Sequence, residues 1–231
     1  LDAAELAELN STTKAALLQL PLVLIELGSQ GAELWSRRQH QGQQSLLEEL
    51  EQRLHQHQGL LLTGGAGTGK TTRVRQLLAN ETARKTLLLA PTGKAAARLR
   101  EALSPLPASM HCATLHRALE ANASGGFGRH HDRPLNADVV VVDEVSMVDT
   151  NLMRALLEAL PTSTRLILVG DSAQLPPIDG SSVLEPLEQQ LKTNQPELLL
   201  QLERSHRFND TTALGSFVQQ LRQDTNPSAL Q

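Results

Sequence analysis

Short, continuous apolar runs separated by helical segments constrain this chain more than any other feature. From residue 59 onward such runs recur, each followed by a loop and a stretch with helical periodicity. Uninterrupted apolar strands are typical of a parallel sheet that is covered by helices on both faces. The pattern therefore predicts an α/β, βαβ nucleotide-binding architecture with strands at GLLLT (59–63), TLLLA (86–90), DVVVVDE (138–144), RLILV (165–169) and ELLLQL (197–202).

Residues 1–58 have a different texture, rich in Leu, Ala, Gln and Glu, with helix-like spacing in LDAAELAEL and SLLEELEQRL. We predict a small, mostly helical N-terminal appendage over 1–58 and an α/β domain over 59–231. The long connection 104–136 is expected to carry function or disorder, with a short helix in MHCATLHRALE and a mobile stretch in NASGGFGRHHDRP.

Composition narrows the class of protein. With 231 residues and 40% apolar residues the chain can bury one good core, and no apolar run approaches membrane-spanning length. A single cysteine and the lack of a recognisable secretory signal favour the cytoplasm. The formal charge of −4 does not indicate a polyanion partner. One segment is nevertheless basic and nearly free of acids, which predicts either a basic face or solvated helix surfaces: Lys70, Arg73, Arg75, Arg84, Lys85, Lys94, Arg98 and Arg100.

The segment GGAGTGKT (64–71) fits the phosphate-binding pattern GxxxxGK[ST], between an expected strand and the helical TTRVRQLLA. Glycines allow backbone N–H groups to turn toward phosphates, Lys70 can reach the β- and γ-phosphates, and the Thr71 hydroxyl can ligate Mg²⁺. The alternative is a glycine-rich turn without a ligand. The nucleotide-binding residues predicted here are Gly64, Gly65, Ala66, Gly67, Thr68, Gly69, Lys70, Thr71 and Thr72.

Acidic and amide side chains follow two of the expected strands. Asp143 can hold the Mg²⁺ shell and Glu144 can polarise the attacking water, although an acidic pair that caps the next helix is an alternative. Asp171 and Gln174 follow RLILV and should reach the same carboxyl edge of the sheet. Because an amide both donates and accepts, Gln174 can sense the γ-phosphate. Hydrolysis of ATP with Mg²⁺ is the expected chemistry.

Six ordered segments resemble the first motor domain of RecD-like superfamily 1 DNA helicases, over roughly residues 59–225. They are GGAGTGKTT, APTGKAAARL, ATLHRAL, VVVVDEVSMVD, LVGDSAQLPPIDGSSVL and LERSHRF. In the bacterial nuclease-helicase, RecD is the alpha subunit of exodeoxyribonuclease V. The resemblance implies that 59–231 is a RecA-like ATPase motor domain. It also implies ATP-dependent 5′ to 3′ movement on single-stranded DNA in repair and recombination, alongside nuclease-complex subunits.

The same resemblance assigns roles to individual residues. Gln174 becomes the γ-phosphate sensor and Arg207 the arginine that stabilises transition-state charge, joining Lys70 and Glu144 as catalytic residues. The expected contacts to the DNA backbone are Thr92, Gly93, Lys94, Thr114 and His116. A solvated lysine is the alternative for Lys94, and a packed or capping histidine for His116.

Two departures from the family pattern shape the expectations. The adenine-recognising glutamine has only Gln43 or Gln44 as candidates, and the family's second motor domain is not in this sequence. The isolated chain is therefore expected to be weakly active. A regulatory ATPase that switches partner binding, without a motor, is the alternative function.

Overall fold

The structure, a computed structural model, describes residues 22–26, 32–79, 81, 84–123, 125–171, 173–174 and 182–202. Contacts divide the chain into two compact units, Leu1–Leu50 and Glu51–Gln231. In the first unit, strands β1 (Leu22–Glu26) and β2 (Ala32–Ser36) pair antiparallel. Helix α3 (Arg37–Gln56) begins directly after β2. Helix α3 agrees with the helical appendage that the sequence predicts, but the described residues of 1–58 also contain a two-stranded sheet, which it does not predict. The predicted domain boundary between residues 58 and 59 stays a prediction.

A six-stranded, all-parallel sheet forms the centre of the second unit, in the order β5-β4-β6-β7-β3-β8. The strands are β3 (Leu60–Gly64), β4 (Thr86–Ala90), β5 (Met110–Thr114), β6 (Val139–Val142), β7 (Arg165–Gly170) and β8 (Leu199–Leu202). The five predicted strands are confirmed within a few residues at each end. Their continuous apolar runs reflect burial on both faces, and all four valines of β6 are fully buried.

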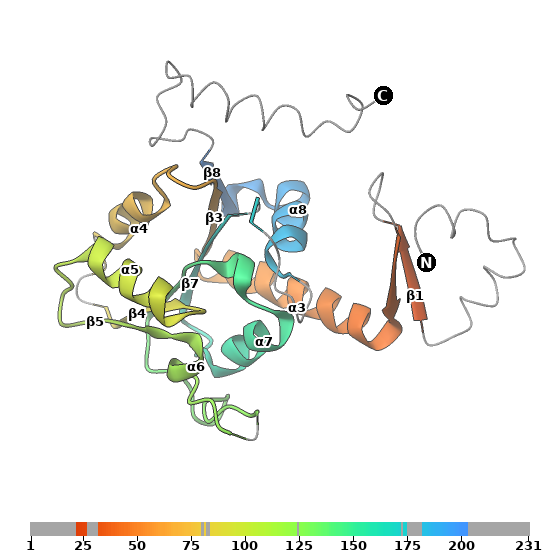
Figure 1. Cartoon of the computed structure of the whole chain (residues 1–231), viewed down its shortest axis with the longest axis horizontal. Helices are drawn as coiled ribbons and strands as arrows, with labels where there is room; N and C mark the ends of the chain where they lie inside the picture. The colour runs from red at the N-terminus through yellow and green to blue at the C-terminus, as the bar shows by residue number, and fades with distance from the viewer. Residues whose placement is uncertain are drawn as a thin grey trace, which may run out of the picture. The chain divides into compact units, whose positions relative to one another are not determined.

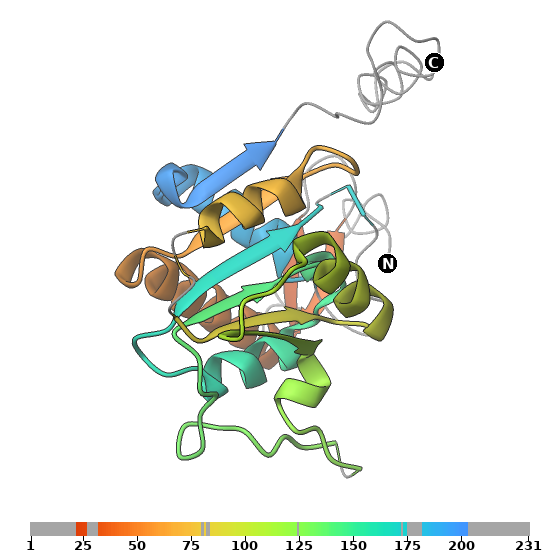
Figure 2. The ribbon, with the colours of Figure 1, turned by 90° about the vertical axis from the view of Figure 1, so that its left-hand side faces the viewer.

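Helices cover both faces of this sheet, as Figures 1 and 2 show, with α4 and α5 on one face and α7 and α8 on the other. The α-helices are α4 (Lys70–Leu78), α5 (Gly93–Leu103), α6 (Leu115–Ala118), α7 (Thr150–Ala159) and α8 (Leu184–Asn194). The 3₁₀ turns are η2 (Val145–Met147) and η3 (Pro196–Leu198). Side chains from α4 and α5 pack with β3, β4, β6 and β7 in one apolar cluster that includes Val74, Leu99 and Ile167.

The prediction of one short helix over residues 110–120 is wrong for the first half of that segment. Residues 110–114 form strand β5, and only the four residues of α6 are helical. Five consecutive residue pairs join β5 to β4 from Thr86↔Met110 to Ala90↔Thr114. The Thr114 side chain then accepts a hydrogen bond from the Arg117 backbone N–H at 3.2 Å, which caps α6. Pairing with a neighbouring strand thus overrides the local helical spacing.

The described residues of 120–134 are tied together by charge pairs. The Glu120 carboxylate lies 2.7 Å from Arg129 Nη2 and 2.7 Å from Arg133 Nη1. Within the described ranges, no helix has the length and apolar character that crossing a membrane requires.

Candidate functional site

The loop between β3 and α4 contains the glycine-rich segment, as its sequence predicts. Gly67 and Gly69 have φ values of 78° and 90°, a left-handed conformation that favours glycine. A Cβ at Gly64 would lie 2.7 Å from the Leu202 carbonyl oxygen and 2.7 Å from Thr68 Oγ1. The Thr68 hydroxyl donates to the Gly65 carbonyl at 2.9 Å and holds the loop closed. The N-cap residue of α4 is Gly69, which makes no side-chain hydrogen bond to the first turn, and a helix N-terminus suits phosphate oxygens.

Lys70 is the first residue of α4 and folds back over the loop. Its Nζ donates to the Gly64 carbonyl and, at 3.1 Å, to the Gly65 carbonyl. The same nitrogen lies 3.9 Å from Asp171 Oδ2. These contacts place the lysine's charge beside the loop that is expected to bind phosphates. Thr71 is half-buried, whereas Ala66 and Thr72 are exposed.

The two acidic residues follow β6 directly. The Glu144 backbone N–H donates to Asp143 Oδ1 at 2.9 Å, and Glu144 itself has a φ of 55°. This left-handed residue turns the chain abruptly from the strand into η2, so that the two carboxylates stay at the strand end. Burial raises the pKa of Asp143 above its ordinary value, and the neighbouring Glu144 charge adds to the increase. The Glu144 N–H and the Lys70 charge oppose it.

Asp171 and Gln174 follow β7, which is parallel to β6 and β3, so they come to the same edge of the sheet as the glycine-rich loop and Asp143. Strand β7 lies between β6 and β3, so the segments that follow these three strands are neighbours. Asp171 is 5% exposed and accepts a hydrogen bond from the Ala173 N–H at 3.1 Å. The Gln174 side chain is exposed, with Nε2 3.5 Å from Asp171 Oδ2. Ser146 Oγ lies 3.3 Å from Gln174 Oε1. The structure therefore brings Lys70, Asp171 and Gln174 together. The roles that the sequence predicts for these residues stay predictions.

Sequence reasoning missed Ser146 as a member of this group. Its side chain is 2% exposed, and it comes from η2 rather than from a strand end. The available signal was a small hydroxyl residue inside an otherwise apolar turn of VDEVSMVD, two residues after Glu144. Only the neighbouring placement of β6 and β7 reveals its partner.

The donor set at this edge fits a magnesium ion. Mg²⁺ prefers oxygen ligands and keeps several waters, so one hydroxyl, one carboxylate and phosphate oxygens suffice. Thr71 is the residue that would supply the hydroxyl, and Asp143 the one that would supply the carboxylate. Burial raises the pKa of Asp143 and so disfavours its charged form, which a divalent cation beside it would favour.

The residues expected to contact DNA lie at the ends of the paired strands β4 and β5. Thr92 Oγ1 accepts from the Ala95 N–H at 3.2 Å and caps α5, while Gly93 and Lys94 are exposed in its first turn. Thr114 caps α6, and the exposed His116 has its ring centroid 6.3 Å from that of Phe127. Both threonines therefore have structural roles as caps. Arg207 lies outside the described residues.

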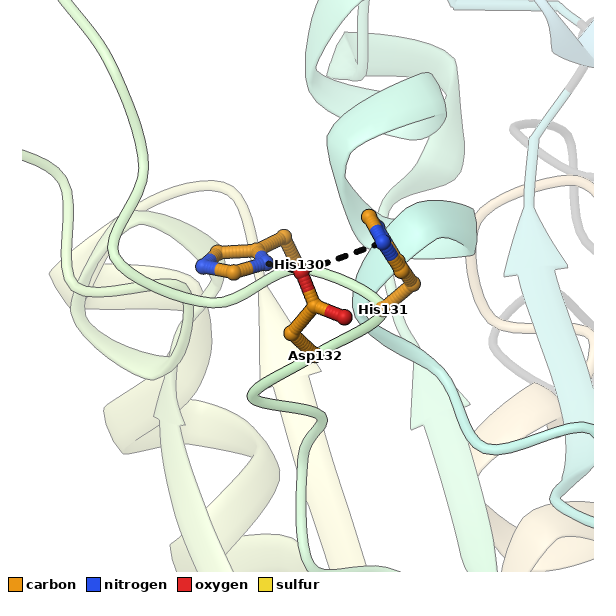
Figure 3. Close-up of side chains that lie close together, drawn as sticks. All are labelled: His130, His131 and Asp132. Atoms are coloured by element: carbon orange, nitrogen blue, oxygen red, sulfur yellow. Dashed lines mark ion pairs between the residues drawn. The ribbon is translucent and has the colours of Figure 1, made fainter.

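A second cluster of chemically capable side chains lies between α6 and β6. Figure 3 shows His130, His131 and Asp132 together, with Asp132 Oδ2 3.1 Å from His131 Nε2 and 3.7 Å from His130 Nδ1. All three are exposed neighbours on one turn. Imidazole and carboxylate are zinc ligand types, but a structural zinc site has four protein ligands. We assign this cluster no role in the nucleotide site.

A parallel sheet with a glycine-rich loop after β3 and carboxylates after β7 and β6 defines a P-loop nucleoside triphosphatase with a RecA-like fold. The chain matches the AAA_19 family, described as an AAA domain, over residues 48–179, and it belongs to that family.

Curated relatives carry the RecD resemblance. The RecBCD enzyme subunit RecD of Mycobacterium tuberculosis is 40% identical over 182 residues, covering 70% of this chain and 31% of that protein. The ATP-dependent RecD2 DNA helicase of Deinococcus radiodurans is 42% identical over 139 residues, covering 59% and 19%. The chain thus spans about a third or less of these relatives. Among solved structures, the Pif1 helicase from Candida albicans aligns with a TM-score of 0.45 at 21% identity, covering 72% of this chain and 40% of that one.

Proposed function

We propose that this chain is the first motor domain of a RecD-type, ATP-dependent DNA helicase or translocase. The observation that carries the proposal is the convergence of Lys70, Asp171 and Gln174 at the end of the sheet where the glycine-rich loop lies. A lysine for the phosphates and an amide within reach of the same carboxylate form a site that can bind a nucleoside triphosphate and report its γ-phosphate. The proposal that the motor acts on DNA rests on the name of a relative, the ATP-dependent RecD2 DNA helicase.

Each part of the site has a step in hydrolysis. The loop N–H groups and Lys70 bind the phosphates. Thr71 and Asp143 would hold Mg²⁺, which would supply positive charge for the phosphate oxygens. Glu144 accepts a proton from the attacking water. Gln174 donates to the γ-phosphate while it is present. Arg207, by family resemblance, adds positive charge in the transition state.

The proposed DNA surface consists of the exposed first turn of α5 and the start of α6. Gly93 and Lys94 offer a helix N-terminus and a cation, which suit phosphate rather than base contacts. Thr92, Thr114 and His116 lie beside them. Single-stranded DNA is the proposed partner, with subunits of a nuclease-helicase complex in the cytoplasm and movement from 5′ to 3′.

The test is the rate of ATP hydrolysis with and without single-stranded DNA, measured on the longest natural form of the protein. Stimulation of several-fold or more supports the motor. A rate of ATP hydrolysis that is the same with and without single-stranded DNA would contradict the motor function and favour the regulatory ATPase.

A further inference from the structure

We infer that Ser146 is a positioning residue for the γ-phosphate sensor: its hydroxyl selects the orientation of the Gln174 amide. This inference rests on the proposed function and concerns the same site. It starts from the hydrogen bond between Ser146 Oγ and Gln174 Oε1, 3.3 Å long, which joins the turn after β6 to the turn after β7.

The turn that holds Ser146 is rigidly built. The Met147 N–H donates to the Glu144 carbonyl at 3.0 Å, and the Val148 N–H donates to the Val145 carbonyl at 2.9 Å. Val145 and Val148 are both fully buried. The Ser146 hydroxyl is therefore a fixed point, whereas Gln174 is an exposed side chain with several free torsions. Of the two partners, the serine sets the geometry.

The direction of this hydrogen bond determines which end of the amide faces the nucleotide. A serine hydroxyl can donate one hydrogen bond, and the glutamine oxygen can only accept. With Oε1 held by Ser146, the amide NH₂ faces Asp171 Oδ2, 3.5 Å away, and that oxygen lies 3.9 Å from Lys70 Nζ. The donor end of Gln174 thus points toward the lysine that is proposed to bind the γ-phosphate. An amide rotated by half a turn would present oxygen to a phosphate oxygen, which is repulsive.

Burial of Ser146 makes the loss of its hydrogen bond to Gln174 energetically unfavourable. Its side chain is 2% exposed, and a buried hydroxyl without an acceptor is costly. A rotated Gln174 amide would turn Nε2 toward Ser146 Oγ, which can accept that hydrogen bond. The serine's own hydrogen would then lose Oε1 as its acceptor, in a place that water cannot easily reach. The serine penalises the wrong orientation and leaves the right one unstrained.

The test is a double-mutant cycle on the longest natural form of the protein, read by steady-state ATP hydrolysis with saturating single-stranded DNA. Ser146→Ala should lower kcat about tenfold, which corresponds to about 1.4 kcal/mol, and leave the KM for ATP within about twofold. Ser146→Thr should retain most of kcat because it keeps the hydroxyl. Gln174→Ala should lower kcat at least as much, and the double variant should equal Gln174→Ala, because the serine acts only through the glutamine.

A matched control separates positioning from folding. Thr164 is also a fully buried hydroxyl residue, and its Oγ1 donates to the Ala137 carbonyl at 2.7 Å just before β7 begins, at the end of that strand away from Asp171. Thr164→Val should lower the thermal midpoint of unfolding without a change in kcat. Ser146→Ala should instead change kcat with a smaller loss of thermal stability.

The experiment distinguishes failure of the Ser146 inference from failure of the proposed motor function. Additive losses in the double variant, or an unchanged kcat in Ser146→Ala, would overturn the serine's role while wild-type ATP hydrolysis stimulated by DNA leaves the proposed function standing. A wild-type protein whose hydrolysis ignores DNA would overturn the proposed motor function first, and with it the sensor that Ser146 is said to orient.

Discussion

Lys70 and Glu144 lie at one site but should fail in different ways. Lys70→Ala removes a cation from the phosphate loop, whereas Glu144→Gln keeps the shape of the side chain and the whole loop intact. We therefore expect Lys70→Ala to weaken ATP binding and Glu144→Gln to bind ATP almost normally while hydrolysis stalls.

The size of the Lys70 effect follows from its contacts. A hydrogen bond to a charged group contributes about 1.5–3 kcal/mol. In the structure, Lys70 Nζ already donates to the Gly64 and Gly65 carbonyls and lies 3.9 Å from Asp171. Because phosphate contacts replace these bonds, only the difference is gained on binding. We expect the lower end of the range, which corresponds to about 10–30-fold weaker ATP binding.

Fluorescence titration with a labelled ATP analogue measures the affinities, and single-turnover hydrolysis measures the chemical step. Glu144→Gln should keep affinity within about threefold and lose about 10²–10⁴ in rate, the usual contribution of a general base. Arg73→Ala is the control for general loss of positive charge, because Arg73 is exposed on the same helix and contacts Gln76. Equal losses of affinity in the Lys70 and Glu144 variants would refute the division of roles.

Three further predictions test other parts of the structure. Because burial raises the pKa of Asp143, its charge opposes folding, so Asp143→Asn should raise the free energy of unfolding at pH 7 without nucleotide or Mg²⁺. That gain should shrink as the pH falls through the raised pKa, which urea unfolding at several pH values measures; a gain that persists in acid would contradict the cause. Lys94→Ala should weaken single-strand binding about equally across sequences and reduce the salt slope by roughly one, with unchanged binding removing Lys94 from the DNA surface. Gly64→Ala should destabilise the fold by about 1–3 kcal/mol in urea unfolding, because its Cβ would collide with the Leu202 carbonyl; wild-type stability would show that β8 yields easily.

Strand β4 and the glycine-rich loop could be predicted from the sequence, because the residues of each segment determine its local structure. The run TLLLA predicts β4 at its observed bounds, 86–90, because a strand buried on both faces needs uninterrupted apolar residues. The glycine-rich loop was predictable for a similar reason. Its backbone needs left-handed conformations at Gly67 and Gly69, and its helix begins at once with Lys70.

Strands that depend on a neighbour were less predictable. In 110–114, Met110 is buried, His111 is exposed and the last three residues are half-buried, so burial does not alternate as in a typical strand. The helical spacing of 110–120 predicts a helix instead. Five residue pairs with β4 decide in favour of a strand. The antiparallel pair β1 and β2 likewise depends on contacts between two segments, in a region whose composition favours helices.

The sequence by itself determined which residues are candidates for the chemistry: a lysine after a glycine-rich loop, carboxylates after a valine strand and an amide after another strand. Tertiary structure alone decided that β7 lies between β6 and β3. That order brings Asp171 to 3.9 Å from Lys70 and Gln174 to 3.3 Å from Ser146, across separations of 101 and 28 residues that no local pattern spans. The physical reason is that side-chain type is local, whereas strand order results from burying both faces of the whole sheet at once.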